Sequence, residues 1–116
     1  MIFKSISLKD SSNPSLHKNC VGVYILRMNG KILKVGSAEI GVQKRMQQYY
    51  SLNSSCGLNA YINIDNRDAI QVDYQTCLKS QCNELESKLF DKYGAETMPW
   101  VQRRPRSLSN TILLML

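Results

Sequence analysis

The strongest constraint on the fold of this chain is a hairpin signal at residues 22–36, which read GVYILRMNGKILKVG. Two short runs of branched and aromatic residues meet at Asn29-Gly30, a dipeptide typical of tight hairpin turns. We therefore expect an antiparallel sheet, in which the register of this hairpin decides which side chains share a face.

Asn29-Gly30 is compatible with two hairpin registers that place different side chains against the core. A two-residue loop puts the charged Arg27 and Lys34 on the same face as branched aliphatic residues. This register would bury their charges against the core. A three-residue loop that begins at Met28 separates the charged from the apolar side chains, and we predict this register. It places two pairs of residues opposite each other, Tyr24 with Lys34 and Gly22 with Gly36.

The two faces of the predicted hairpin differ in chemistry. One face is wholly apolar and holds Val23, Ile25, Leu33 and Val35. The opposite face holds Gly22, Tyr24, Leu26, Ile32, Lys34 and Gly36. A phenol and an amine beside two glycines, which leave space above the backbone, are typical of a binding or catalytic site.

Apolar spacing predicts two helices and one further strand. Residues 41–52 and 78–93 repeat apolar side chains at helical intervals, and residues 69–75 alternate as a half-buried strand does. The longer helix is expected to end at Gly94, a residue typical of helix C-termini. Its predicted apolar face consists of Leu78, Cys82, Leu85, Leu89 and Phe90.

The flanking segments complete the predicted order of elements. Residues 2–8 are a further candidate strand, and SSNPS at 11–15 and SLNSSCG at 51–57 are predicted as loops. The order then reads β-β-α-(loop or α)-β-α. Short antiparallel strands interleaved with helices indicate the α+β class.

The whole chain, residues 1–116, is predicted to be one domain, because its length supports one substantial core and not two. Its formal charge is +6, from 15 Lys and Arg residues against 9 Asp and Glu residues. This balance favours an anionic partner, of which nucleic acid is the commonest. A mildly basic surface without a partner accounts for the charge alone.

The cysteines and the apolar runs indicate in which cellular compartment the protein is expected. The four cysteines lack the CxxC spacing of metal sites, and the one histidine lies near only one of them, so a zinc site is disfavoured. The N-terminal residues lack the apolar core of a signal peptide, and the longest apolar run, ILLML, is far too short to span a bilayer. We expect a cytoplasmic protein with reduced thiols and no membrane partner.

Three polar side chains outside the hairpin are placed to join it. Arg45 and Tyr49 are four residues apart on the first predicted helix, so they share a face beside its apolar stripe. Glu86 follows Leu85 at the edge of the apolar face of the second helix. Glu84 lies about 200° around that helix from Glu86 and is expected to be solvated.

These residue types together suit the hydrolysis of a phosphodiester bond. An arginine binds the scissile phosphate and offsets its developing charge. A carboxylate holds a hard divalent cation such as Mg²⁺. A phenol or an amine with a lowered pKa, here Tyr24 or Lys34, takes a proton from the attacking water.

Three segments resemble the motifs of the GIY-YIG nuclease family. The hairpin carries GVY and KVG separated by ILRMNGKIL, which is similar to the paired motif of that family and has its usual spacing. QKRMQQYY resembles the helix that follows, and ELESKLFDKYG resembles the glutamate-bearing helix. Three motifs in the same order are more specific than any one of them. The resemblance covers about residues 20–94, with residues 95–116 as a basic and apolar extension.

The resemblance implies a fold and a set of functional residues. The implied fold is a small three-stranded antiparallel sheet flanked by helices. Tyr24 and Arg45 are implied to be catalytic, with Tyr49 as their partner in the active site. Glu86 is implied to be the ligand of one Mg²⁺ or Mn²⁺ ion, and the implied activity is endonucleolytic hydrolysis of DNA.

The chain departs from the family pattern at three places. Lys34 stands where the second motif begins with tyrosine, and it is either a base or phosphate contact or the mark of a weakened active site. Ser37 stands where the DNA-repair members carry a lysine, so Lys34 is a candidate source of that amine. The asparagine that often follows a proline beyond the glutamate helix is missing, and MPWVQ offers Gln102 instead.

A basic segment near the C-terminus adds candidate contacts to nucleic acid. The candidates in this segment are Trp100, Arg103, Arg104 and Arg106, and Lys44 on the first predicted helix is a further candidate. Basic residues bind phosphates, and tryptophan stacks on bases. An exposed basic tail explains the segment equally well.

We therefore hypothesise a metal-dependent endonuclease that hydrolyses DNA, including branched or structured DNA such as flaps and junctions. The alternative is a catalytically inactive nucleic-acid-binding module of the same fold, and a protein-interaction domain is a third hypothesis. The sequence leaves open DNA versus RNA, monomer versus homodimer, and a role in DNA repair, restriction or mobile elements.

Overall fold

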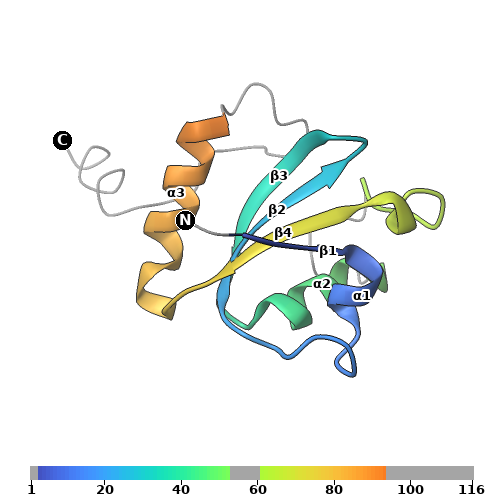
Figure 1. Cartoon of the computed structure of the whole chain (residues 1–116), viewed down its shortest axis with the longest axis horizontal. Helices are drawn as coiled ribbons and strands as arrows, with labels where there is room; N and C mark the ends of the chain where they lie inside the picture. The colour runs from blue at the N-terminus through green and yellow to red at the C-terminus, as the bar shows by residue number, and fades with distance from the viewer. Residues whose placement is uncertain (1–2, 53–60, 94–116) are drawn as a thin grey trace.

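Four antiparallel strands form the central sheet of the computed structural model, which describes residues 3–52 and 61–93 (Figure 1). The strands are β1 (Lys4–Ser7), β2 (Gly22–Met28), β3 (Lys31–Ala38) and β4 (Gln71–Thr76). They lie side by side in the order β1-β4-β2-β3, so β3 is an edge strand. The predicted α+β class is confirmed. The resemblance implies three strands, and the sheet has a fourth, because the candidate strand at residues 2–8 is present as β1 and pairs with β4.

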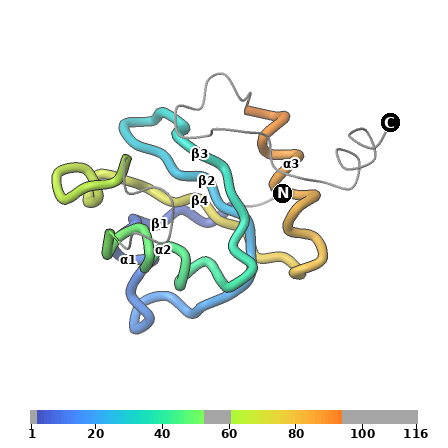
Figure 2. The backbone as a smooth tube through the Cα atoms, turned by 180° about the vertical axis from the view of Figure 1, so that it is seen from behind, coloured from blue at the N-terminus to red at the C-terminus, as the bar shows by residue number. Residues whose placement is uncertain are grey.

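Helices cover both faces of this sheet. The helices are α1 (Leu8–Ser12), α2 (Val42–Tyr50) and α3 (Cys82–Tyr93), with 3₁₀ turns at η2 (Arg67–Ala69) and η3 (Lys79–Gln81). Figures 1 and 2 show α1 and α2 together on one side of the sheet and α3 on the other. Within the described residues, no helix has the length and apolar character needed to cross a membrane.

The hairpin turn differs from the predicted one. Asn29 and Gly30 both have positive φ, 54° and 78°, and Met28 pairs directly with Lys31 across a two-residue turn. The predicted three-residue loop is therefore wrong. Both turn residues tolerate the left-handed conformation, which allows the tight turn whose twist matches the strands. The register then shifts by one residue next to Arg27.

This shift, a β-bulge, decides which residues lie opposite each other. Beyond it, Leu26 pairs with Lys34 and Tyr24 pairs with Gly36. The predicted pairs of Tyr24 with Lys34 and of Gly22 with Gly36 are wrong, and Gly22 pairs with Ala38. The bulge absorbs one extra residue of β3, which leaves the predicted faces of β2 unchanged.

Two apolar clusters lie on the two faces of the sheet. The cluster under α1 and α2 includes Leu8, Tyr24, Leu26, Leu33, Val42, Met46, Tyr49, Val72 and Tyr74. The cluster under α3 is built from Val23, Ile25, Val35, Leu89 and Phe90, and Ile32 packs against it. Leu33 and Ile32 thus lie on faces opposite to those predicted. The bulge reverses the alternation at this point of β3.

The other predicted elements are present with changed ends. α2 and β4 lie within or close to residues 41–52 and 69–75, as predicted. α3 begins at Cys82, and Leu78 is 66% exposed and extended rather than part of the apolar face. The 3₁₀ turn η3 between them offsets Leu78 from the helical stripe.

The N-terminal connection also differs from the prediction. Residues 11 and 12, predicted as part of a loop, belong to α1. The Ser7 hydroxyl accepts a hydrogen bond from the Asp10 backbone N–H, which caps the first turn of this short helix. Gly94, residues 95–116 and most of the predicted loop at 51–57 lie outside the described residues.

Candidate active site at the β3 edge

The five residues predicted as the site come from four elements and meet around the edge strand β3. Tyr24 lies on β2, Lys34 on β3, Arg45 and Tyr49 on α2, and Glu86 on α3. The helices α2 and α3 lie on opposite faces of the sheet, and the charges of Arg45 on α2 and Glu86 on α3 both act on the pKa of Lys34 on the edge strand β3. Sequence-distant groups therefore converge at one place.

Tyr24 and Tyr49 form the buried part of the site. Their hydroxyl oxygens are 2.5 Å apart, a short hydrogen bond, and their rings meet edge to face. Burial, and then the neighbouring Tyr49 phenol, raise the pKa of Tyr24 well above its usual value. Tyr24 is therefore a neutral phenol near pH 7, able to donate or accept a hydrogen bond.

Gly36 is what lets Tyr24 occupy this position. A Cβ on Gly36 would lie 2.6 Å from both the Oη and the Cζ of Tyr24. Any larger residue would push the phenol away, so the glycine of the KVG motif makes room for the ring that pairs with it across the hairpin.

Lys34 has the chemistry of a candidate base. Burial lowers the pKa of its ammonium, and the positive charge of Arg45 lowers it further, while the Glu86 carboxylate opposes them and raises it. Within residues 3–52 and 61–93, no carboxylate lies within ion-pair distance of Lys34. At a given pH, a larger fraction of Lys34 than of an exposed lysine is therefore in the neutral amine form.

Arg45 offers an unpaired positive charge to the same place. Its Nη1 donates to the Gln48 Oε1 at 3.3 Å, and its Nε is buried without a hydrogen-bond partner among the described residues. No described carboxylate lies within ion-pair distance of its guanidinium. Its charge acts on the pKa of both Tyr24 and Lys34, which places it within electrostatic reach of both.

Glu86 is a half-buried carboxylate held by a serine. The Ser37 hydroxyl donates a hydrogen bond to its Oε1 at 2.6 Å. Burial raises the pKa of Glu86, the Ser37 hydrogen bond and Lys34 lower it, and the nearby Glu39 raises it. Glu84, two residues earlier, is exposed as predicted.

Sequence reasoning missed Ser37 and Glu39 as members of the site. Ser37 was noted only as a departure from a family pattern, yet it orients the carboxylate that the motifs identify. Its position directly after Gly36 was the available signal. Glu39 is exposed at the end of β3 and carries no motif, so only its proximity to Glu86 reveals it.

The described residues offer a carboxylate donor at this place but no closed cage for a metal ion. No group of three or more His, Cys, Asp or Glu side chains in the described part of the chain is arranged to hold a metal. Mg²⁺, however, keeps several waters and is commonly bound through one or two carboxylates together with substrate phosphates. The half-buried Glu86 carboxylate, oriented by Ser37, is a donor of this kind.

A groove of about 330 Å³ lies along the outer side of α2, beside the site. It is lined by Ile40, Lys44, Gln47, Gln48 and Ser51. Gln48 connects it to the site, because it accepts the hydrogen bond from Arg45. Lys44 is exposed here, as a nucleic-acid contact requires.

The remaining candidate contacts to nucleic acid, Trp100, Arg103, Arg104 and Arg106, lie outside the described residues, and so does Gln102. Their prediction from the sequence is unchanged.

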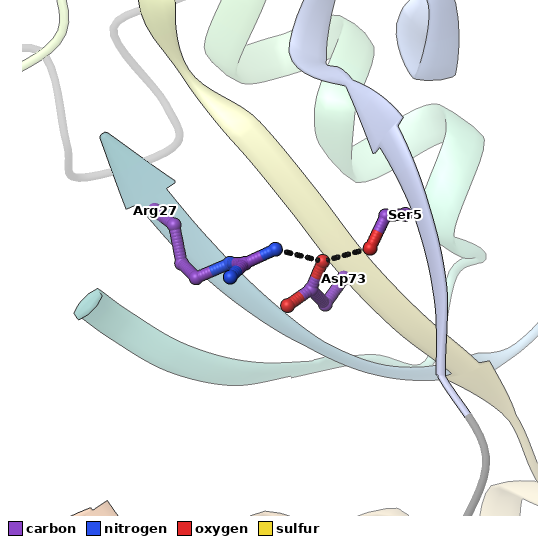
Figure 3. Close-up of polar contacts among 3 residues, drawn as sticks. All are labelled: Ser5, Arg27 and Asp73. Atoms are coloured by element: carbon purple, nitrogen blue, oxygen red, sulfur yellow. Dashed lines mark hydrogen bonds and ion pairs between the residues drawn. The ribbon is translucent and has the colours of Figure 1, made fainter. Parts of the chain in front are cut away.

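A second polar cluster lies on the sheet and involves none of the predicted residues. Asp73 on β4 accepts a hydrogen bond from the Ser5 hydroxyl of β1 at 2.5 Å (Figure 3). The same carboxylate oxygen forms an ion pair with the Arg27 Nη2 of β2 at 2.8 Å. This cluster joins three neighbouring strands of the sheet.

No protein-family model, curated protein or solved structure matches this chain. The function must therefore be argued from the site itself.

Proposed function

We propose that this chain is a metal-dependent endonuclease that hydrolyses DNA phosphodiester bonds, and that it is a GIY-YIG-type domain with Lys34 in place of the tyrosine of the second motif. The observation that carries the proposal is the convergence of Lys34, Arg45 and Glu86 at the β3 edge. Each belongs to a different element, and the charges of Arg45 and Glu86 both act on Lys34, while no ion pair joins these residues in the described part of the chain.

Arg45 binds the scissile phosphate in this proposal. Its guanidinium presents donors in a planar fork that matches two phosphate oxygens. Its buried Nε has no partner in the described part of the chain, and its Nη1 is engaged only by the neutral Gln48. The guanidinium charge is therefore available to offset the negative charge that develops on the phosphate.

Lys34 takes the proton of the attacking water. A base must release its own proton near the working pH, and burial shifts the pKa of Lys34 downward while it shifts that of Tyr24 upward. The water oxygen attacks phosphorus, its proton moves to the Lys34 Nζ, and the bond from phosphorus to the leaving oxygen breaks. Tyr24 remains a neutral phenol, and its hydroxyl is held in place by the hydrogen bond to the Tyr49 hydroxyl.

Glu86 would hold the divalent cation, with Ser37 keeping the carboxylate in place. A bound Mg²⁺ or Mn²⁺ ion supplies Lewis-acid polarisation of a phosphate oxygen. The raised pKa of Glu86 is consistent with a carboxylate whose charge is incompletely balanced by the protein.

The groove along α2 is the proposed path of the DNA strand next to the cleaved bond. Lys44 would contact a phosphate, and Gln47 and Gln48 would offer amide groups to the strand. The formal charge of +6 supports an anionic substrate.

The test is the nicking of supercoiled plasmid in Mg²⁺ or Mn²⁺ by wild type and by the Glu86→Ala and Arg45→Ala variants. We expect nicking by wild type and its loss in both variants. Glu84→Ala is the matched control, because it removes an exposed carboxylate from the same helix and should leave nicking unchanged. Circular dichroism of each variant checks that the fold is intact.

Nicking that survives both substitutions would contradict the proposal and indicate a contaminating nuclease or a different site. If wild type cuts neither plasmid nor flap and junction substrates, but binds DNA in a salt-sensitive manner, the chain is the inactive binding module instead. Binding that is insensitive to salt would favour a protein partner.

A further inference from the structure

Two cysteines lie in contact at the junction between β4 and α3, beside the candidate site. The Sγ atoms of Cys77 and Cys82 are 3.5 Å apart, and both thiols are reduced. Cys77 directly follows β4, and Cys82 is the first residue of α3. The 3₁₀ turn η3 brings the two residues together.

The two thiols differ in access. Cys82 is fully buried, whereas Cys77 is half-buried and packs at the margin of the cluster under α3. Burial, together with the contact to Cys77, raises the pKa of Cys82 to about 12. A reagent from solution therefore meets Cys77 first, with Cys82 behind it.

We propose that Cys77 and Cys82 form a reversible disulfide, a modification site that takes a small-molecule disulfide such as oxidised glutathione as its oxidant. Disulfide sulfurs are about 2.05 Å apart, so the two Sγ atoms need to approach by about 1.5 Å from their present contact. Cys77 is the less movable residue, because its backbone N–H donates to the Val21 carbonyl at 3.1 Å.

The reaction proceeds in two exchange steps. The Cys77 thiolate attacks one sulfur of the oxidant, whose S–S bond breaks, and one small-molecule thiolate leaves. The deprotonated Cys82 then attacks the Cys77 sulfur of this mixed disulfide, and the second small-molecule thiolate leaves. The two cysteines together lose two electrons and two protons, and the oxidant gains both as it becomes two thiols.

The disulfide would act on Glu86 through α3. Cys82 and Glu86 are four residues apart, so they lie on the same face of the helix, and the Glu86 charge is close enough to act on the pKa of Cys82. Pulling the start of α3 toward Cys77 displaces Glu86 from the Ser37 hydroxyl that holds it. This part of the inference rests on the proposed function, whereas formation of the disulfide does not.

The chain is favourable for a direct test by peptide mapping. Trypsin cleaves after Lys79, which separates Cys77 in residues 68–79 from Cys82 in residues 80–88. The other two cysteines lie on further tryptic peptides, residues 19–27 and 46–67. Each possible disulfide therefore gives a distinct pair of linked peptides.

The experiment treats the folded full-length protein with oxidised glutathione, blocks remaining thiols, and maps the digest by mass spectrometry. We expect the loss of two of the four free thiols, recovery of the 68–79 and 80–88 pair, and disappearance of this pair after dithiothreitol. Cys20→Ser should leave the pair unchanged, and Cys77→Ser should abolish it. A digest without the pair, or with Cys77 linked to Cys20 instead, would overturn the proposal, and the wild-type map requires no variant to fold.

Nicking by the oxidised protein gives the second readout. We expect it to fall at least about tenfold and to return on reduction, because displacements of about 1 Å at a reacting centre are costly. If the linked peptides are recovered but nicking does not change, the disulfide is supported and its proposed effect on Glu86 is refuted. If neither redox form nicks DNA, the proposed function fails while the peptide map still decides the disulfide.

Discussion

The polar cluster around Lys34 and Glu86 and the polar cluster around Asp73 differ in how their charges are balanced. Asp73 is paired with Arg27 at 2.8 Å and accepts a second hydrogen bond from Ser5 (Figure 3). The charges of Lys34 and Glu86 act on each other's pKa, yet no ion pair joins the two residues in the described part of the chain. Burial lowers the pKa of Lys34 and raises that of Glu86, which favours the neutral form of each.

The comparison separates a structural cluster from a candidate functional one. A buried arginine Nε without a partner among the described residues occurs in both clusters, at Arg27 and at Arg45, so that feature alone distinguishes nothing. The difference is that the Arg27 guanidinium has a carboxylate partner, whereas among the described residues the Arg45 guanidinium has only an amide. Charges that a fold leaves unbalanced are available to a substrate or a cation.

Substitution of Lys34 in the unbalanced cluster should have the greatest effect on activity. If its amine is the general base, Lys34→Met lowers the nicking rate by about 10²–10⁴-fold. In wild type the single-turnover rate should rise with pH through a pKa below that of an ordinary lysine, because the folded environment disfavours the ammonium. The pH–rate profile of both proteins, measured on plasmid, checks this.

Lys34→Arg is the matched control for charge, since a guanidinium stays protonated throughout this range. The Lys34→Arg variant should be as inactive as Lys34→Met, and its nicking rate should not rise with pH as that of wild type does. An arginine variant with wild-type activity would instead make Lys34 a phosphate contact and return the role of base to Tyr24.

The next effect concerns the serine that holds Glu86. We expect Ser37→Ala to raise the Mg²⁺ concentration needed for half-maximal nicking by about 10–100-fold, because losing a group that orients a metal ligand weakens metal binding by this much. Raising the Mg²⁺ concentration should restore much of the rate, and Ser37→Thr, which keeps the hydroxyl, should behave like wild type. An alanine variant with an unchanged Mg²⁺ titration would remove Ser37 from the site.

The third prediction addresses the balanced cluster. Asp73→Ala removes the partner of both Arg27 and Ser5, and we expect it to lower the free energy of unfolding by about 1–2 kcal/mol without changing the nicking rate. Urea denaturation measures the first quantity. Asp65→Ala, at an exposed position, should stay within about 0.5 kcal/mol of wild type. A loss of activity in a folded Asp73→Ala protein would break the distinction between the clusters.

The last prediction is a small gain in stability, in contrast to the loss of stability expected for Asp73→Ala. Glu86→Gln should raise the free energy of unfolding at neutral pH, by about 0.5 kcal/mol, while it abolishes nicking. Because the folded state raises the pKa of Glu86, the folded protein binds its proton more tightly than the unfolded chain does. The contribution of Glu86 to stability is therefore present below its unfolded pKa and lost as pH rises through its folded pKa. Wild type should show this loss and Glu86→Gln should not, in urea denaturation across acidic to neutral pH.

Local patterns in the sequence were enough to predict the α+β class, the helices α2 and α3, the strand β4 and the two faces of β2. These features depend on local periodicity, which is present in the sequence independently of tertiary contacts. The five predicted site residues also came from the sequence, through motif spacing and a family resemblance, and the fold brings them to one edge of the sheet. Their catalytic roles stay predictions.

Tertiary contacts were needed to establish the hairpin register, the pairing of the N-terminal strand with β4 and the partners of Glu86. The bulge beside Arg27 and the pairing of β1 with β4 result from contacts between strands, which no local pattern encodes. Ser37 and Glu39 reach Glu86, 49 and 47 positions away in the sequence, only because β3 lies at the edge of the sheet where α3 can meet it. Cys77 and Cys82 are close in the sequence, but the contact between their sulfurs depends on the turn η3.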